Sequence, residues 1–208
     1  SSFFDVPPMI YGNKPTDGGH LILSSDEKDQ LIDQHPETEP WIKQLMGADE
    51  FMKGKRRYCL WLVNVPEQAF MAVPPVAKRV QAVREERLRS KKLATRDKAS
   101  TTWKFDENRH PENPYLVLPR ITSERRPYVP VAFLSPEIVC NDKNYMVPAN
   151  DLYVAGMLMS EMHLDWMRLT SGRMKSDYSY SITLTYNTFP WPDCDNAQRK
   201  QIESFAEG

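Results

Sequence analysis

Cysteine is scarce in this sequence, and long apolar runs are absent from it. Its three cysteines, Cys59, Cys140 and Cys194, lie far apart and form no C-x-x-C pair. This spacing argues against a disulfide framework and against a zinc knuckle, and it suits a reducing cytoplasm. There is also no signal peptide and no apolar run of about 18 residues, so the sequence predicts neither export nor a membrane span.

An excess of charge of one sign is missing as well. With 27 Lys and Arg against 28 Asp and Glu, the formal net charge is −1. The whole chain therefore has no general attraction to nucleic acid, and any basic surface on it must be local.

Patterns that indicate metal binding or hydrolysis are also missing. The four histidines have no partner four residues away and no cluster of carboxylates beside them, so we predict no metal site. We interpret His163, within a predicted buried helix, as a core residue. An Asp…Asp-x-Lys pattern, which is typical of some nucleases, is matched by Asp17, Asp26 and Lys28. A helix-capping box at residues 24–27 explains the second of these aspartates more simply, so we do not expect a nuclease.

The stretch "NTFPWP" at residues 187–192 invites comparison with the Asn-Pro-Pro-aromatic loop of amino-methyltransferases. It lacks the Pro-Pro step that follows the asparagine there, and no glycine-rich turn precedes it to hold a nucleotide cofactor. We therefore interpret it as the end of a strand and predict no catalytic residue in this chain.

What is present is enough for a folded domain. The chain has 208 residues, 40% of them hydrophobic, and it begins Ser-Ser-Phe without a methionine, so we expect a fragment of a longer polypeptide. Helices and strands alternate without regular βαβ spacing, which predicts an α+β fold with a mixed, mostly antiparallel sheet. The predicted helices cover residues 24–35, 40–46, 74–92 (long and basic), 151–170 (long and buried) and 197–206. The predicted strands cover residues 58–63, 115–118, 128–134, 137–140 and 178–187.

Two short regions are locally basic. Residues 78–98 hold nine Lys or Arg against three acids, and residues 120–126 combine arginines with hydroxyl side chains after a strand. Guanidinium and hydroxyl groups together suit phosphate oxygens. The alternatives are a solvated helix face for the first region and a surface network of arginines with Glu124 for the second.

Six stretches resemble the target-recognition domain of MmeI-type restriction-modification enzymes and related adenine-specific DNA methyltransferases. They are "GNKPTDGGHLIL" (12–23), "RRYCLWL" (56–62), "RVQAVREERLRSKKLAT" (79–95), "LPRITSERRPYVPVAF" (118–133), "MLMSEMHLDWMR" (157–168) and "GRMKSDYSYSITLTYNTFPWP" (172–192). The resemblance follows nearly the whole chain in order, and the last stretch is its most specific part.

The resemblance implies a module that reads double-stranded DNA along the major groove. It implies an extended lead-in from an upstream methyltransferase domain at residues 1–23, a recognition domain at 24–192 and a terminal helix at 193–208. The longer polypeptide would methylate adenine N6 with S-adenosylmethionine, a cofactor that we do not expect this fragment to bind. Whether that polypeptide also carries an endonuclease domain is left open.

The resemblance also suggests which residues read bases. Lys175 and Asp177 look like the paired base-reading positions of the family, and lysine suits guanine while aspartate suits the cytosine amino group. A surface Lys–Asp ion pair, with a contribution below about 1 kcal/mol, is the alternative. The loop 140–145 resembles a second recognition loop, with Asn141, Asp142 and Lys143 as candidates. The predicted phosphate-binding residues are Arg84, Arg87, Lys91, Lys92, Arg120, Ser123, Arg125, Arg126 and Arg173.

A different class of function remains open on the residues alone. The chain could be a protein-interaction or structural appendage whose basic helix packs on an acidic partner. A DNA mobility shift that depends on salt distinguishes the two classes, because phosphate contacts release counterions.

Overall fold

The computed structural model describes residues 4–207, and the chain forms two compact units. Unit 1 combines the segment ending at Gly12 with Pro111–Pro136 and the segment beginning at Asp142. Unit 2 combines Asn13–His110 with Glu137–Asn141. Strand pairing is antiparallel except for one pair, and helices lie beside the sheets, so the predicted α+β class is confirmed. No helix within residues 4–207 is long and apolar enough to cross a membrane.

Unit 1 is built on a four-stranded antiparallel sheet in the order β1-β9-β5-β7. Every residue of the two central strands is buried, as expected for strands that are covered on both faces. A smaller sheet has the order β10-β11-β6. The strands are β1 (Ile10–Tyr11), β5 (Tyr115–Pro119), β6 (Ile121–Thr122), β7 (Ala132–Leu134), β9 (Asn144–Val147), β10 (Gly172–Met174) and β11 (Asp177–Ser179).

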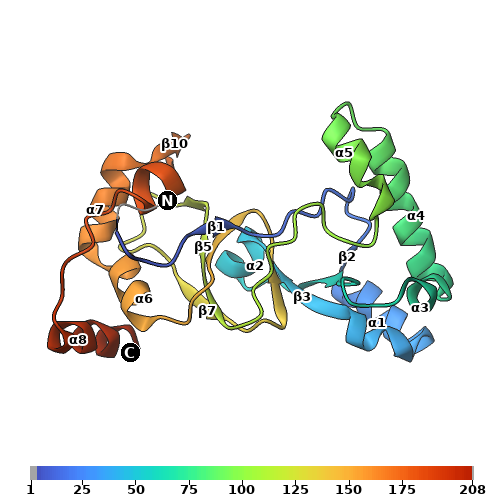
Figure 1. Ribbon diagram of the computed structural model, residues 1–208, viewed down its shortest axis with the longest axis horizontal. Helices are drawn as coiled ribbons and strands as arrows, with labels where there is room; N and C mark the ends of the chain where they lie inside the picture. The colour runs from blue at the N-terminus through green and yellow to red at the C-terminus, as the bar shows by residue number, and fades with distance from the viewer. Residues whose placement is uncertain (1–3, 208) are drawn as a thin grey trace. The chain divides into compact units, whose positions relative to one another are not determined.

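Three helices complete unit 1 and lie together in Figure 1: α6 (Leu152–Met159), α7 (Glu161–Thr170) and α8 (Asn196–Glu207). Helix α8 packs on α6, where Gly156 permits a close approach. A Cβ at this position would lie 2.9 Å from Cγ2 of Ile202. The predicted terminal helix is confirmed.

The single helix predicted over residues 151–170 is wrong at one residue. Ser160 has extended backbone angles (φ −65°, ψ 154°), and its hydroxyl accepts a hydrogen bond from the amide of His163 at 3.2 Å. A serine side chain competes with the helix for backbone donors and favours an N-cap. Ser160 therefore ends α6 and caps α7, and the two helices share one apolar core.

The strand predicted over residues 178–187 is also wrong beyond its first residues. β11 ends at Ser179, and Ile182–Tyr186 form a π-helical turn. The hydroxyl of Ser181 accepts from the amide of Leu184 at 3.1 Å and so starts the turn. Because the backbone coils here, Tyr186 is fully buried while Leu184 is 59% exposed, although a strand would place both on one face.

Unit 2 has a four-stranded sheet in the order β2-β4-β3-β8, in which only β3 and β8 run parallel. Its strands are β2 (Ile22–Leu23), β3 (Ile42–Met46), β4 (Arg57–Leu60) and β8 (Ile138–Cys140). Its helices are α1 (Ser25–Gln34), η1 (Pro36–Trp41), α2 (Ala48–Lys53), α3 (Glu67–Met71), α4 (Pro74–Leu88), α5 (Leu93–Asp97) and η2 (Lys98–Ser100). Helices α3, α4 and α5 lie together in Figure 1.

Two helices of unit 2 begin where short sequence motifs predict that they begin. Ser24 and Glu27 form the predicted capping box of α1, with reciprocal bonds of 3.2 and 2.9 Å. Two prolines open α4, as predicted, although it ends at Leu88. The helix predicted over residues 40–46 is wrong, because β3 is paired on both sides, with β4 and with β8.

His163 is a core residue of unit 1, as the sequence predicts. Its side chain is fully buried, and Nδ1 donates to the carbonyl of Leu158 at 2.8 Å. Nε2 accepts from the hydroxyl of Tyr180 at 2.9 Å, so both ring nitrogens are engaged in the neutral form. Burial lowers the pKa of His163 from 6.5 to about 4, against a smaller opposing effect of the Leu158 carbonyl.

We expect this histidine to make the stability of unit 1 depend on pH. As the pH falls from 6.5 towards 4, the unfolded chain takes up a proton at His163 that the folded unit does not bind. The free energy of unfolding should therefore fall by about 3 kcal/mol over this range and be fully restored above pH 7. Denaturant titrations at a series of pH values measure how the free energy of unfolding changes with pH. His163→Gln should flatten this dependence on pH, and a variant whose stability falls as steeply as that of the wild type between pH 6.5 and 4 would contradict the assignment.

Candidate nucleic-acid interface

Lys175 and Asp177 lie at the tip of a β-hairpin in unit 1. β10 pairs with β11 so that Met174 faces Asp177, and the connecting loop therefore has two residues, Lys175 and Ser176. Lys175 is exposed and Asp177 is half-buried at the start of β11. The backbone of Lys175 has φ +58°, a left-handed value that is uncommon for any residue other than glycine, asparagine or aspartate. A positive φ at the first loop residue is typical of a type II′ hairpin turn.

The two predicted base-reading side chains do not bind each other. Within residues 4–207, neither Lys175 nor Asp177 forms an ion pair or a side-chain hydrogen bond. The ion pair that offered the alternative interpretation is therefore not formed. Both a donor and an acceptor remain available to a ligand at this tip.

The basic loop 123–126 follows the strand that adjoins this hairpin. β6 pairs with β11, with Thr122 opposite Tyr178. The loop then turns tightly, because Arg126 donates its amide to the carbonyl of Ser123 at 3.2 Å. The hydroxyl of Ser123 accepts from the amide of Arg125 at 3.3 Å, and Arg125 is exposed. The structure thus brings the arginines of this loop close to the hairpin in unit 1.

The loop at residues 142–143 is held by Arg120. Its amide donates to the carbonyl of Lys143 at 3.1 Å, and its Nη1 donates to the carbonyl of Asp142 at 3.0 Å. The guanidinium also lies over the rings of Tyr11 and Tyr145, 5.2 and 5.7 Å from their centroids. Arg120 therefore orders this loop, and its role as a phosphate ligand stays a prediction.

Asn141, predicted to read bases, is buried instead. It belongs to unit 2 and is 8% exposed, and its amide donates to the carbonyl of Met46 at 3.0 Å. Asn141 directly follows β8, whose parallel pairing with β3 ends at Met46 and Cys140, and its low exposure shows that the folded unit covers its side chain. The prediction for Asn141 is wrong, whereas Lys143 is exposed and Asp142 is half-buried, and both stay candidates.

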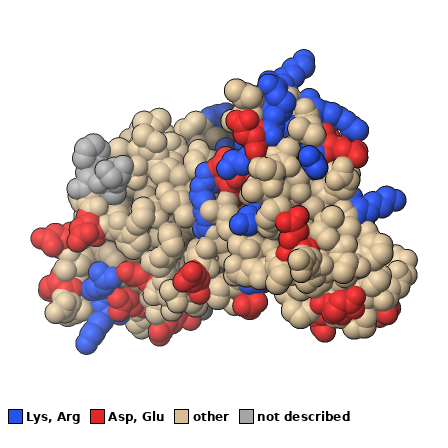
Figure 2. All heavy atoms as spheres, turned by 45° about the vertical axis from the view of Figure 1, so that its right-hand side comes forward, with Lys and Arg blue, Asp and Glu red and all other residues tan. Residues whose placement is uncertain are grey.

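Unit 2 carries a basic surface over the end of α4 and over α5. Figure 2 shows Lys and Arg side chains gathered there with a few Asp and Glu side chains among them, whereas acidic side chains predominate at the opposite end of the unit, over α1. The exposed basic residues of this surface include Arg84, Arg89, Lys91 and Lys92. Such a separation of charge gives a locally positive field on a chain with almost no net charge.

A cavity of about 380 Å³ opens on this basic surface. Its lining includes the basic residues Lys14, Arg89 and Lys92, together with Ser90, Thr95 and one acidic residue, Glu86. Sequence reasoning missed Lys14 as a member of this surface, because about 75 positions separate it from Arg89 along the chain. Only the folded unit brings them together, so no local pattern could have identified it.

Arg87, predicted to bind phosphate, is part of the core of unit 2. It is 1% exposed, and its guanidinium donates five hydrogen bonds of 2.7–3.1 Å to backbone carbonyls. Burial lowers the pKa of this guanidinium, and Asp106 and Asp17 oppose the shift. The prediction for Arg87 is wrong, because all its donors face the protein. The acceptors are the carbonyls of Pro15, Thr16, Lys98, Thr101 and Lys104.

The acidic residues of the nuclease pattern have structural roles. Asp17 is 3% exposed, and its carboxylate accepts from the amides of Gly19 and Leu21 at 3.0 and 2.7 Å. Asp26 lies in the first turn of α1. Among residues 4–207, no group of three or more His, Cys, Asp or Glu is placed to hold a metal ion.

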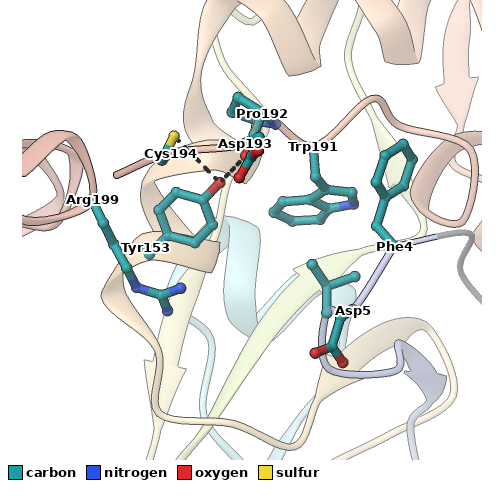
Figure 3. A pocket seen from close by; sticks show the side chains of 9 residues that line it. Phe4, Asp5, Tyr153, Trp191, Pro192, Asp193, Cys194 and Arg199 are labelled. Atoms are coloured by element: carbon teal, nitrogen blue, oxygen red, sulfur yellow. Dashed lines mark hydrogen bonds between the residues drawn. The ribbon is translucent and has the colours of Figure 1, made fainter. Parts of the chain in front are cut away.

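A second cavity, of about 390 Å³, lies beside α6 and α8 in unit 1 (Figure 3). The hydroxyl of Tyr153 donates to the carbonyl of Pro192 at 3.2 Å, and burial raises the pKa of Tyr153 to about 12. Arg199 lies over the Tyr153 ring and pairs with Asp151 at 2.9 Å. Cys194 also lines this cavity, and its Sγ lies 3.9 Å from the hydroxyl of Tyr153. The contacts of Arg199 fix α8 on α6.

Known proteins share both the sequence and the fold. Residues 1–193 match the family described as "MmeI, target recognition domain". The chain is 34% identical over 199 residues to DNA methyltransferase A of Bacillus subtilis (strain 168), a match that covers 96% of this chain and 23% of that protein. A solved structure of the Type IIL restriction-modification enzyme MmeI in complex with DNA has a TM-score of 0.96 and 38% identity, and the match covers 100% of this chain and 28% of that one. The chain thus spans about a quarter of the length of these relatives.

Proposed function

Because this chain belongs to the MmeI target recognition domain family, we propose that it binds double-stranded DNA and reads base edges in the major groove. The observation that carries the proposal is the hairpin tip, where Lys175 and Asp177 are available and unpaired with each other. Side chains of opposite hydrogen-bonding character, two residues apart, match the two edges of one base pair. The solved MmeI complex with DNA, at 38% identity over the whole chain, supports the same role.

One G·C pair fits the chemistry of this tip. Lysine donates to O6 and N7 of guanine, and aspartate accepts from the N4 amino group of cytosine. The loop at residues 142–143 of unit 1 also carries an acceptor and a donor, Asp142 and Lys143, which we assign to a second base pair. In this proposal the hairpin and the loop read sequence, and arginines around them bind phosphates.

The proposed phosphate contacts come from exposed and partly exposed residues of both units. They bind any sequence alike, since phosphates carry no base information. In unit 1 we assign them to the loop after β6, where Ser123, Arg125 and Arg126 lie. In unit 2 we assign them to Arg84, Lys91 and Lys92 and extend the surface to Lys14 and Arg89, which line its cavity.

The longer protein that contains such a chain is, in this proposal, an adenine-specific DNA methyltransferase that uses S-adenosylmethionine. Its relative of 34% identity is named as a DNA methyltransferase, and this chain spans 23% of that protein. Between residues 4 and 207 no strand leads through a glycine-rich turn into a helix, which is the usual cradle of a nucleotide cofactor. Gly18 and Gly19 have positive φ, but their turn leads into the short strand β2. In this proposal the cofactor and the methyl transfer belong to an upstream domain of the longer protein.

The salt dependence of DNA binding tests the basic surface of unit 2. Replacing Arg84, Lys91 and Lys92 with Ala should weaken binding to all duplexes alike. The slope of log K against log salt should become shallower by about one unit for each phosphate contact that is lost. Fluorescence anisotropy of a labelled duplex across salt concentrations measures both effects.

A matched control removes the same charge elsewhere. Lys53, Lys55 and Lys200 are exposed and lie outside the proposed surface, so their replacement with Ala should leave the slope close to that of the wild type. Equal slopes in both triple variants would show that α4 and α5 are scaffold. Binding of the wild type that does not depend on salt would favour the alternative function, a protein-interaction module.

A further inference from the structure

The hairpin tip has a conformation that its own sequence does not favour. A two-residue type II′ loop prefers glycine at its first position, yet Lys175 occupies this position with φ +58°. A non-glycine residue held in the left-handed region persists only when surrounding contacts determine it, and such residues cluster at functional sites. Contacts outside the loop must therefore hold the tip.

Those contacts come from one side chain, Arg173. Its guanidinium lies 3.9 Å from the centroid of the Tyr178 ring, directly across the two strands. Nη1 donates to the carbonyl of Ser176 at 2.7 Å and approaches the Glu124 carboxylate at 3.3 Å. Nη2 donates to the hydroxyl of Tyr178 at 3.0 Å. Arg173 thus joins the loop, the opposite strand and the basic loop after β6.

The carbonyl that Arg173 holds belongs to Ser176, the residue between the two proposed base readers. On a hairpin, Arg173 and Tyr178 project from one face, whereas Met174 and Asp177 project from the other. The guanidinium therefore acts from the face opposite to Asp177. It constrains the backbone on which both readers stand without occupying their side of the hairpin.

We propose that Arg173 is a positioning residue for base reading, rather than the phosphate ligand that its sequence suggests. This inference rests on the proposed function of the hairpin. A planar guanidinium can stack on a ring and donate in several directions within its plane at once, whereas an ammonium can do only part of this. Arg173 fixes Ser176, and through it the separation and direction of Lys175 and Asp177. Discrimination at one base pair depends on that geometry.

Arg173→Lys separates the two roles, because it keeps the charge and loses the stacked, planar contacts. The 208-residue chain is incubated with a randomised duplex library, and the bound sequences are counted. Asp177→Ala identifies the base pair that the tip reads. We expect Arg173→Lys to lower the preference at this pair by about tenfold, with other positions, the salt slope and the melting temperature unchanged. Arg168→Lys, at an exposed arginine of α7 in the same unit that the proposal assigns no contact with DNA, is the matched control and should keep the full preference.

Three outcomes would overturn the proposal. If Arg173→Lys keeps the preference while Arg173→Ala makes the salt slope shallower by about one unit, Arg173 binds phosphate. If Arg173→Lys lowers the preference at every position together with the melting temperature, its role is general stability. If the wild-type chain selects no sequence although the same selection succeeds with a known DNA-binding protein, the proposed function fails and the positioning role fails with it.

Discussion

Replacing Arg87 with methionine is expected to unfold unit 2 or to lower its free energy of unfolding by about 3–5 kcal/mol. The guanidinium is 1% exposed and holds five carbonyls from the segments around Pro15 and Lys98 through Lys104. Methionine matches much of the volume but donates nothing, so these five partly buried carbonyls would lose their hydrogen-bond donor. Because the carbonyls come from two separate segments, both would loosen from α4 together.

Urea denaturation followed by tryptophan fluorescence measures this loss, since Trp61 and Trp103 pack against the core of unit 2. Arg84→Met is the control on the same helix. Arg84 is exposed, so its replacement should change the free energy of unfolding by less than about 0.5 kcal/mol. An Arg87→Met variant as stable as Arg84→Met would contradict the structural role of Arg87.

The case of Arg87 shows why site prediction from sequence was incomplete. It stands among the exposed basic residues Arg84, Arg89 and Lys91, and nothing local distinguishes it from them. Its burial depends on segments that cover it from positions 71 residues before and 11–17 residues after it in the chain. Asn141 was misjudged for the same reason, because its burial depends on a parallel strand pair between distant segments.

The fold was predictable where local chemistry decides it. The capping box of α1 and the prolines that open α4 are encoded within a few residues and were predicted. β3 depends on partners on both sides, and its residues alone favoured a helix. The hydroxyls of Ser160 and Ser181 each redirect the backbone by a single capping bond, which an apolar periodicity cannot show.

The second large effect concerns the hairpin tip. The double substitution of Lys175→Glu with Asp177→Arg should reverse the proposed preference from G·C to C·G at one position. Glutamate accepts from the cytosine amino group, and arginine binds O6 and N7 of guanine with two hydrogen bonds. The backbone need not change, since glutamate faces the same cost of positive φ as lysine does at this position.

Single substitutions should behave differently from the pair. Either change alone leaves one partner opposite a mismatched base edge, so it should lose about 1–3 kcal/mol of discrimination without creating a new preference. Non-specific affinity should change little in the double variant, because the summed charge of the two positions is the same. The affinity and the preference are therefore separate readouts of one experiment.

Base reading by Lys175 and Asp177 is tested by the base preference of the double variant. Binding selection from a randomised duplex library, with the wild type and Lys175→Glu/Asp177→Arg side by side, gives the preference at every position. We expect C·G to replace G·C at a single position while all other positions keep their preference. An unaltered recognition sequence would contradict it and would leave Lys175 and Asp177 as residues of a surface hairpin that read no base.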